Sequence, residues 1–144
     1  MKSSLFTLLI SLSILFPAAS QARDTLHRLP FDTVVQSMMA EHKLDGSVKF
    51  YLAGNTPNDT KIIQSGVVVN KKTNAVNKSD QAACNWALES ALLSLQDSAK
   101  QVGAQSVVNI VSFYKRNEYS DPRNYECHAG TMMAGIILKA DLAN

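Results

Sequence analysis

The sequence predicts an α+β domain in which a mainly antiparallel, four-stranded sheet is packed by one long helix. Three observations predict this class: one long amphipathic segment at 81–102, strand-like segments on both sides of it, and a short helical segment at 30–42. The predicted order of elements is α-β-β-α-β-β. With 144 residues, the chain has room for one compact domain and not for two.

Residues 1–22 predict a secretory signal peptide and are excluded from the fold. Lys2 provides a positive start, Leu5–Phe16 is an uncharged apolar run, and the small residues Ser20 and Ala22 occupy the −3 and −1 positions before Arg23. A buried N-terminal helix or an uncleaved anchor is the alternative interpretation. We therefore expect an exported protein, periplasmic or secreted, with a single α+β domain at 23–144.

Before the long helix, the sequence predicts a short helix and two strands. Apolar residues recur at helical spacing over 30–42, where Asp32 is placed to cap the helix. Ser47–Leu52 alternates apolar and polar residues, as a half-buried strand does. Lys61–Val69 is rich in Ile and Val and predicts a second strand, with Gly66 as a candidate bulge.

The long helix has clear signals at both ends. The polar segment Asn70–Lys78 predicts solvent-exposed turns before it, and the alternative for the lysines of this segment is a basic anion site. Ser79 or Asp80 is placed to cap the helix, and Gly103 ends it. One stripe of the helix is apolar. It consists of Cys84, Leu88, Ala91, Leu92, Leu95, Ala99 and Val102.

Beyond the long helix, the sequence predicts two more strands. Ala104–Tyr114 is apolar on both faces, as a central strand is. Lys115–Asn124 predicts a charged loop. Tyr125–Ala140 predicts one last long strand, with Gly130 and Gly135 as bends or bulges.

The two cysteines, Cys84 and Cys127, predict one disulfide. Their number is even, and an exported chain reaches an oxidising compartment. Cys84 lies near the start of the long helix on its apolar stripe, and Cys127 lies early in the last strand, so a helix lying on the sheet brings them together. The alternatives are two buried free thiols, or a metal or redox pair. The chain-entropy model gives such a bridge about 4 kcal/mol of stability.

Four residues, Trp86, Asn109, Tyr114 and His128, are candidates for a ligand or interface site. Trp86 places an indole on the long helix, as a core or interface anchor or as a stacking partner for a ligand. Asn109 is polar within an apolar strand, which predicts either a structural hydrogen-bond network or a ligand contact. His128 follows Cys127 and is either a surface residue beside a disulfide or part of a metal or thiol site.

Composition and motifs argue against several classes of function. The formal net charge of +2 provides no basic field for nucleic acid. No second apolar run of membrane-spanning length follows the first one. His27, His42 and His128 form no close ligand pair, and neither G-x-S-x-G nor Cys-x-x-Cys occurs. We therefore expect no metal, no cofactor and no enzymatic activity.

Several segments of the mature chain form a familiar set. They are Lys71-Lys72-Thr73-Asn74-Ala75, Ala83-Cys84-Asn85-Trp86-Ala87, Gly103-Ala104-Gln105-Ser106-Val107-Val108-Asn109-Ile110, Tyr125-Glu126-Cys127-His128-Ala129-Gly130 and Met133-Ala134-Gly135-Ile136-Ile137-Leu138-Lys139. Together they resemble a family of small exported bacterial proteins that is often labelled "excinuclease ATPase subunit". The likeness covers nearly all of 23–144.

Two further resemblances concern the helix, the Gly-Ala-x-x-Val-Val turn and the strand that follows. This part is similar to YbjQ-like domains and to the outer-membrane lipoprotein that senses stress for the Rcs pathway. That lipoprotein also holds this kind of domain with disulfides, whereas this chain has one candidate bridge and no lipid-attachment motif. The ATPase label itself fails, because it requires a G-x-x-x-x-G-K-[ST] loop and the sequence contains no Gly-Lys dipeptide.

We therefore expect a non-enzymatic, exported module that binds an envelope protein or a small ligand, or that takes part in an envelope stress response. The alternative is a periplasmic enzyme or redox-responsive protein whose site has no recognisable motif. A pocket with converging polar groups and perturbed titratable residues would favour the alternative, and an exposed apolar patch would favour the module. Because the predicted sheet is apolar on both sides, its second face needs a cover, from the first helix or from a second subunit in a homo-oligomer.

Overall fold

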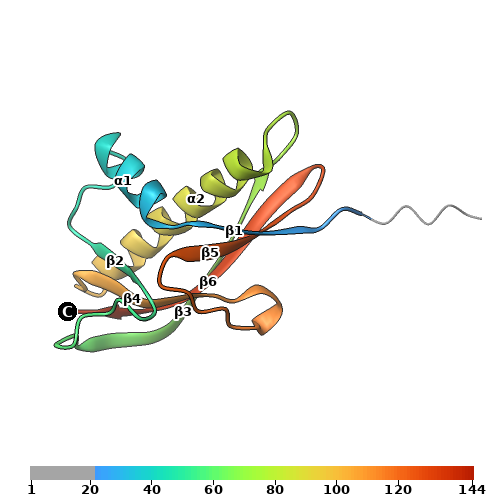
Figure 1. The fold of residues 1–144 in the computed structure, drawn as a ribbon. Coiled ribbons are helices and arrows are strands. Elements are labelled where there is room, and N and C mark those ends of the chain that lie inside the picture. Colours follow the sequence, from blue (N-terminus) through green and yellow to red (C-terminus); the bar gives the residue numbers. More distant parts are fainter. Residues whose placement is uncertain (1–21) are drawn as a thin grey trace, which may run out of the picture.

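The computed structural model describes residues 22–144, so the expected signal peptide, apart from Ala22, lies outside the described residues. The described part forms an α+β fold with two α-helices and six strands (Figure 1). In chain order these are β1 (Thr25–Pro30), α1 (Asp32–Ala40), β2 (Lys49–Leu52), β3 (Ile62–Asn74), α2 (Asp80–Gln101), β4 (Ser106–Ser112), β5 (Asn124–Ala129) and β6 (Met133–Ala143). A short 3-10 turn, η1 (Tyr114–Arg116), follows β4.

The sheet is mixed and is built around β6. β3 pairs with β6 along one edge, while β5 pairs with its first residues and β4 with its last residues on the other edge. β1 adds to β5 and β2 adds to β4. All pairs are antiparallel except β2 with β4, which is parallel. The α+β class is therefore confirmed. The expectation of a mainly antiparallel sheet of four strands was wrong in strand number, and the sheet is mixed because of this one parallel pair.

The strand predictions differ from the structure in three places. β1 was missed, because its polar residues hide the alternation and its pairing partner, β5, comes about a hundred residues later. The predicted last strand is two strands, since the chain reverses after Gly130, whose N–H donates to the carbonyl of Met133 (2.8 Å). β3 continues to Asn74, where exposed turns were expected, because β6 pairs with it as far as Met133.

The helix boundaries follow local signals, with one exception. The Ser79 side chain accepts a hydrogen bond from the N–H of Ala82 (3.1 Å), which confirms it as the cap of α2. Gly103 follows α2 with a φ of +71°, a conformation that suits glycine at a helix end. In α1, Asp32 lies in the first turn rather than at the cap, a position occupied by Phe31. A carboxylate in the first turn still interacts favourably with the helix dipole.

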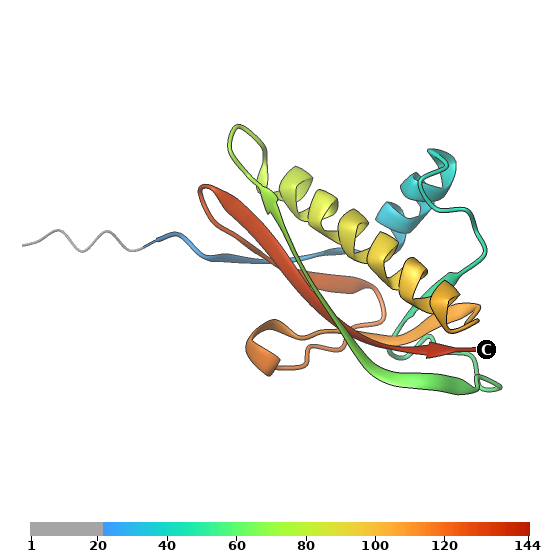
Figure 2. The same ribbon diagram turned by 180° about the vertical axis from the view of Figure 1, so that it is seen from behind.

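The two α-helices lie on one side of the sheet (Figures 1 and 2). Alternate side chains of β6 face α2 and are almost fully buried. These are Ala134, Ile136, Leu138, Ala140 and Leu142. The predicted stripe of α2 is buried against them, except Val102, which is 39% exposed. The short helix thus packs on the same side as α2 and does not cover the second face.

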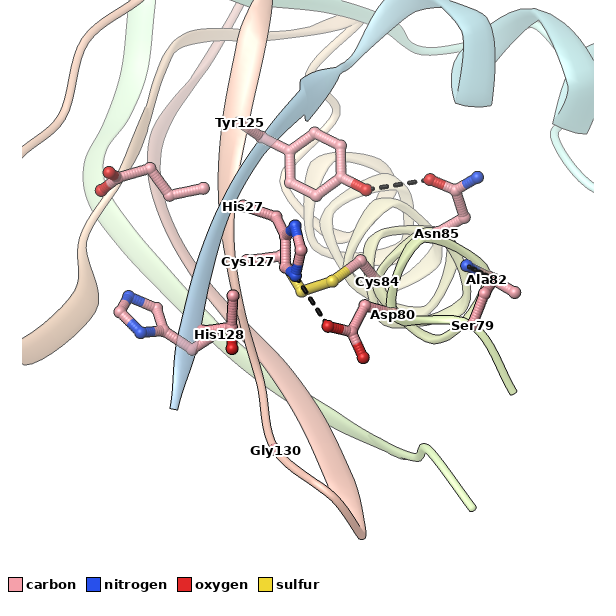
Figure 3. Close-up of a disulfide and its surroundings, with 12 residues drawn as sticks. His27, Ser79, Asp80, Ala82, Cys84, Asn85, Tyr125, Cys127, His128 and Gly130 are labelled. Atoms are coloured by element: carbon pink, nitrogen blue, oxygen red, sulfur yellow. Dashed lines mark hydrogen bonds and ion pairs between the residues drawn. A yellow bond between two sulfur atoms is a disulfide. The ribbon is translucent and has the colours of Figure 1, made fainter. Parts of the chain in front are cut away.

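The predicted disulfide joins α2 to β5. The Cα atoms of Cys84 and Cys127 are 5.8 Å apart, and both residues are fully buried. Figure 3 shows that the side chains of Cys127 and His128 lie on opposite sides of β5, with the disulfide on the side of α2. The prediction of this bridge is confirmed.

The other side of the sheet, here called the open face, has no α-helix from the described residues (Figure 2). The segment from Phe113 to Arg123, which contains η1, turns back on this side, and Tyr119 exchanges two hydrogen bonds with Ser112 (3.0 and 2.8 Å). β4 is buried on both faces, which confirms it as an internal strand. Among residues 22–144, neither α-helix has the length and apolar character needed to cross a membrane.

Candidate functional site

The structure brings together two of the four candidate residues, Tyr114 and His128. Their rings are stacked, with centroids 3.4 Å apart and planes inclined by 18°. Asp24 contacts both: its carboxylate lies 2.9 Å from Nδ1 of His128 and accepts a longer hydrogen bond from the Tyr114 hydroxyl (3.4 Å). The segment before β1, η1 and β5 therefore converge at one point on the open face.

The stacked rings line a pocket of about 580 Å³. β3 contributes Asn70 and Lys72, and β6 contributes its first residues, including Ile137. The turn before β6 adds Met132, and β6 begins with Met133; these residues are 68% and 48% exposed. Pockets of this size with an apolar lining and a few polar groups are typical of small-molecule sites.

One row of the sheet determines the shape of the pocket. Gly135 of β6 pairs with His128 of β5 on one side and with Lys72 of β3 on the other. Residues in register share a face, so two long side chains flank a position that has no side chain. A Cβ atom at Gly135 would lie 3.3 Å from Cγ of Lys72 and 3.4 Å from the carbonyl oxygen of Lys71. Because glycine has no side chain, the wall of the pocket is hollowed at Gly135, and the stem of Lys72 lies close beside this hollow.

The turn that carries Tyr114 has an unusual backbone. Lys115 and Arg116, which follow it, have φ values of +51° and +63°. Non-glycine residues in this region cost about 1 kcal/mol or more each and persist where the surroundings fix them. The Nζ of Lys115 lies 5.4 Å from the centroid of the Tyr114 ring. This turn places the ammonium of Lys115 beside Tyr114, one of the two stacked rings of the pocket.

An ion-pair network anchors the N-terminal rim of the pocket. The guanidinium of Arg23 binds both oxygens of Asp80 (2.7 and 3.0 Å) and donates to the carbonyl of Gly130 (2.8 Å). His27 Nε2 lies 2.8 Å from the same carboxylate (Figure 3). Arg23 and then His27 lower the pKa of Asp80 to about 2. The network links the start of β1 to the start of α2 and to the β5–β6 turn.

Asn109 lies elsewhere, in an irregular part of β4. Its φ is +53°, which asparagine tolerates better than most residues. The side-chain oxygen accepts from the Thr56 hydroxyl (2.8 Å), and Nδ2 donates to Asp141 (2.9 Å). The backbone N–H of Asn109 also donates to Thr56 (3.1 Å). These contacts match the structural hydrogen-bond network that was one of the two alternatives predicted for Asn109.

Trp86 is 55% exposed on α2, so of the roles expected for it the core anchor is excluded, and the interface anchor and the stacking partner stay predictions. The Nζ of Lys78 lies 4.3 Å from the centroid of its ring, an arrangement with favourable cation–π energy. Trp86 is not among the residues that line the pocket. It stays a candidate interface residue.

Sequence reasoning missed most members of the pocket, among them Asp24, Asn70 and Gly135. Gly135 was expected to bend a strand, and it instead lies in regular pairing within β6. Lys72 had a signal, because a basic anion site was the alternative for its segment. Asp24 carried no signal at all, since its partner in the sequence lies 104 positions away.

Comparisons with protein-family models, with curated proteins and with solved structures found no match for this chain. The resemblance to small exported bacterial proteins and to YbjQ-like domains therefore stays a prediction.

Proposed function

We propose that this protein is an exported, non-enzymatic binding module of the cell envelope that holds a small ligand in the pocket of the open face. One observation carries the proposal. Stacked aromatic rings, a lysine and exposed methionines line one pocket around the hollow at Gly135, and the Lys72 stem lies against this hollow. The resemblance to stress-sensing envelope proteins supports the location and is the reason to expect a role in the envelope.

Two polar side chains of the pocket, which have no partner among the described residues, are free to bind a ligand. Within residues 22–144, neither the ammonium of Lys72 nor the side-chain amide of Asn70 makes a hydrogen bond or an ion pair. Both lie beside the apolar Ile137, and Met133 stands exposed at the rim. Unfilled hydrogen-bonding groups next to apolar side chains match the composition of binding sites.

The contacts of His128 favour binding over catalysis. Nδ1 is engaged by Asp24, and the ring is stacked on Tyr114. A histidine that activates a nucleophile lies within hydrogen-bond reach of a hydroxyl or thiol. Among the described residues, His128 makes no hydrogen bond to a serine, threonine or cysteine. The alternative function, a periplasmic enzyme, would use the Asp24–His128 pair as a base for a nucleophile on the substrate.

Export is part of the proposal, and the disulfide supports it. A buried bridge between Cys84 and Cys127 suits an oxidising compartment. We expect the protein isolated from the periplasm to begin at Arg23. N-terminal sequencing measures this directly, and a mature protein that keeps Met1 to Ala22 would overturn the expectation.

The binding proposal is tested by what the protein retains. The mature protein is purified from the periplasm under native conditions, and small molecules released on denaturation are identified by mass spectrometry. Gly135→Leu fills the hollow, while Val68→Leu enlarges an exposed side chain of β3 outside the pocket. We expect the wild type and Val68→Leu to release the same compound, and Gly135→Leu to release none of it. An equal yield from all three proteins would contradict the proposal, and recovery of a chemically altered compound would favour the enzyme.

A further inference from the structure

We infer that the ligand of this pocket is a small organic anion whose carboxylate lies over Gly135, between Lys72 and His128. The inference rests on the proposed function and adds the chemical class of the ligand. It is carried by the row of three residues across β5, β6 and β3, by the charges around the row, and by the apolar side chains beside it.

The three residues of this row are spaced so that the side chains of Lys72 and His128 can enclose a flat group between them. Neighbouring strands lie about 4.8 Å apart, so the backbones at His128 and Lys72 are separated by about 10 Å. Gly135 lies midway between them, in register with both. A flat group can therefore approach the backbone at Gly135 while side chains enclose it on two sides. Glycine within a strand is typical of such close approach.

The charge around the hollow favours an anion. Within residues 22–144, no carboxylate lies within ion-pair distance of Lys72, Lys115 or Arg116. The one carboxylate among the lining residues, Asp24, is engaged with the imidazole of His128. The lining therefore has an ammonium without a partner among the described residues, and its one carboxylate accepts hydrogen bonds from the two ring side chains.

The apolar lining indicates an organic anion. Ile137 and the stacked Tyr114 and His128 rings offer surface for a carbon skeleton, and Met133 can adapt to its shape. A small, strongly hydrated anion would leave these apolar groups uncovered. A volume of about 580 Å³ is also far more than a carboxylate alone needs.

Benzoate and benzamide are the matched probes, because they share a ring and differ in charge. Their dissociation constants are measured by ligand-observed NMR titration of the mature protein at low ionic strength. We expect benzoate to bind, and benzamide to bind about fivefold more weakly, as the loss of one exposed charge pair predicts.

Two variants locate the contact, and a third is the matched control. Lys72→Gln removes the ammonium, and Gly135→Ala places a methyl group in the hollow at a position without positive φ. Lys71→Gln removes a neighbouring lysine that does not line the pocket and points to the other face. We expect the Kd for benzoate to rise about fivefold in Lys72→Gln and in Gly135→Ala, and to stay within about twofold in Lys71→Gln.

The experiment distinguishes a ligand that is not an anion from a pocket that does not bind the probes at the proposed position. Equal affinity for benzoate and benzamide, both weakened by Gly135→Ala, would overturn the anion class and leave the binding pocket standing. Binding of benzoate that neither Lys72→Gln nor Gly135→Ala changes, or no binding of either probe, would overturn the inference. In that case retention of a compound by the purified wild-type protein would decide whether the pocket binds anything.

Discussion

The two faces of the sheet differ in how completely their side chains are satisfied. On the helix face, the core side chains of β6 are at most 1% exposed, and the hydroxyl of the buried Tyr125 donates to Asn85 (3.0 Å). On the open face, Lys72 and Asn70 have no side-chain partner among the described residues, and methionines are exposed. The difference leads us to assign stability to the helix face and the proposed ligand binding to the open face.

Two adjacent isoleucines of β6 lie on opposite faces of the sheet and allow the two faces to be compared directly. Ile136 is 1% exposed in the core, and Ile137 faces the pocket. We expect Ile136→Ala to lower the free energy of unfolding by about 2–5 kcal/mol, through lost burial and a cavity. Ile137→Ala should lower it by about 1 kcal/mol or less. Urea unfolding of both variants measures the contrast, and equal losses would break the comparison.

The disulfide contributes to the helix face by limiting the unfolded chain. It closes a loop of 43 positions, so its loss should lower the free energy of unfolding by about 2–4 kcal/mol. Cys84→Ala tests this by urea unfolding. Adding Cys127→Ala should change little, because the bridge is lost only once. A second loss as large as the first would show that the cysteines contribute mainly by packing.

Gln96 is the exception on the helix side. It is 6% exposed, and its Oε1 atom has no hydrogen-bond partner within residues 22–144. A buried acceptor without a partner costs about 1–3 kcal/mol. We therefore expect Gln96→Met, which has a similar length and no unsatisfied oxygen, to raise the midpoint of thermal unfolding. A lower midpoint would mean that the amide of Gln96 has a structural role.

Asp80, at the start of α2, binds Arg23 at the rim of the pocket, and the contribution of this contact to the stability of the fold should depend on pH. Its pKa in the folded protein, about 2, lies below the ordinary value of 3.8 because Arg23 and His27 bind the carboxylate. A lowered folded-state pKa adds stability above the ordinary value, and this stability is lost as pH falls from about 4 towards 2. We expect the melting temperature of Asp80→Asn to fall less than that of the wild type as pH is lowered over this range. An unchanged slope would contradict the anchoring role of this network.

The features that could be predicted from sequence are those with local signals. Ser79 before the apolar stripe predicts the start of α2, and an even number of cysteines in a chain expected to be exported predicts the bridge. β1 and the parallel pairing of β2 with β4 could not be predicted, since strand pairing depends on segments far apart in the chain. For the same reason, Tyr114 and His128 were candidates singly, and only the fold places Asp24 and Lys72 beside them.

The central claim is that the open face at Gly135, and not the helix face, binds the ligand. Its most direct test is a map of backbone amide shifts of the ¹⁵N-labelled mature protein on addition of benzoate. We predict saturable shifts confined to the region of Lys72, Tyr114, His128 and Gly135, with the amides around Cys84 and Trp86 unchanged. Saturable shifts centred on α2, with those at Gly135 unchanged, would contradict the claim.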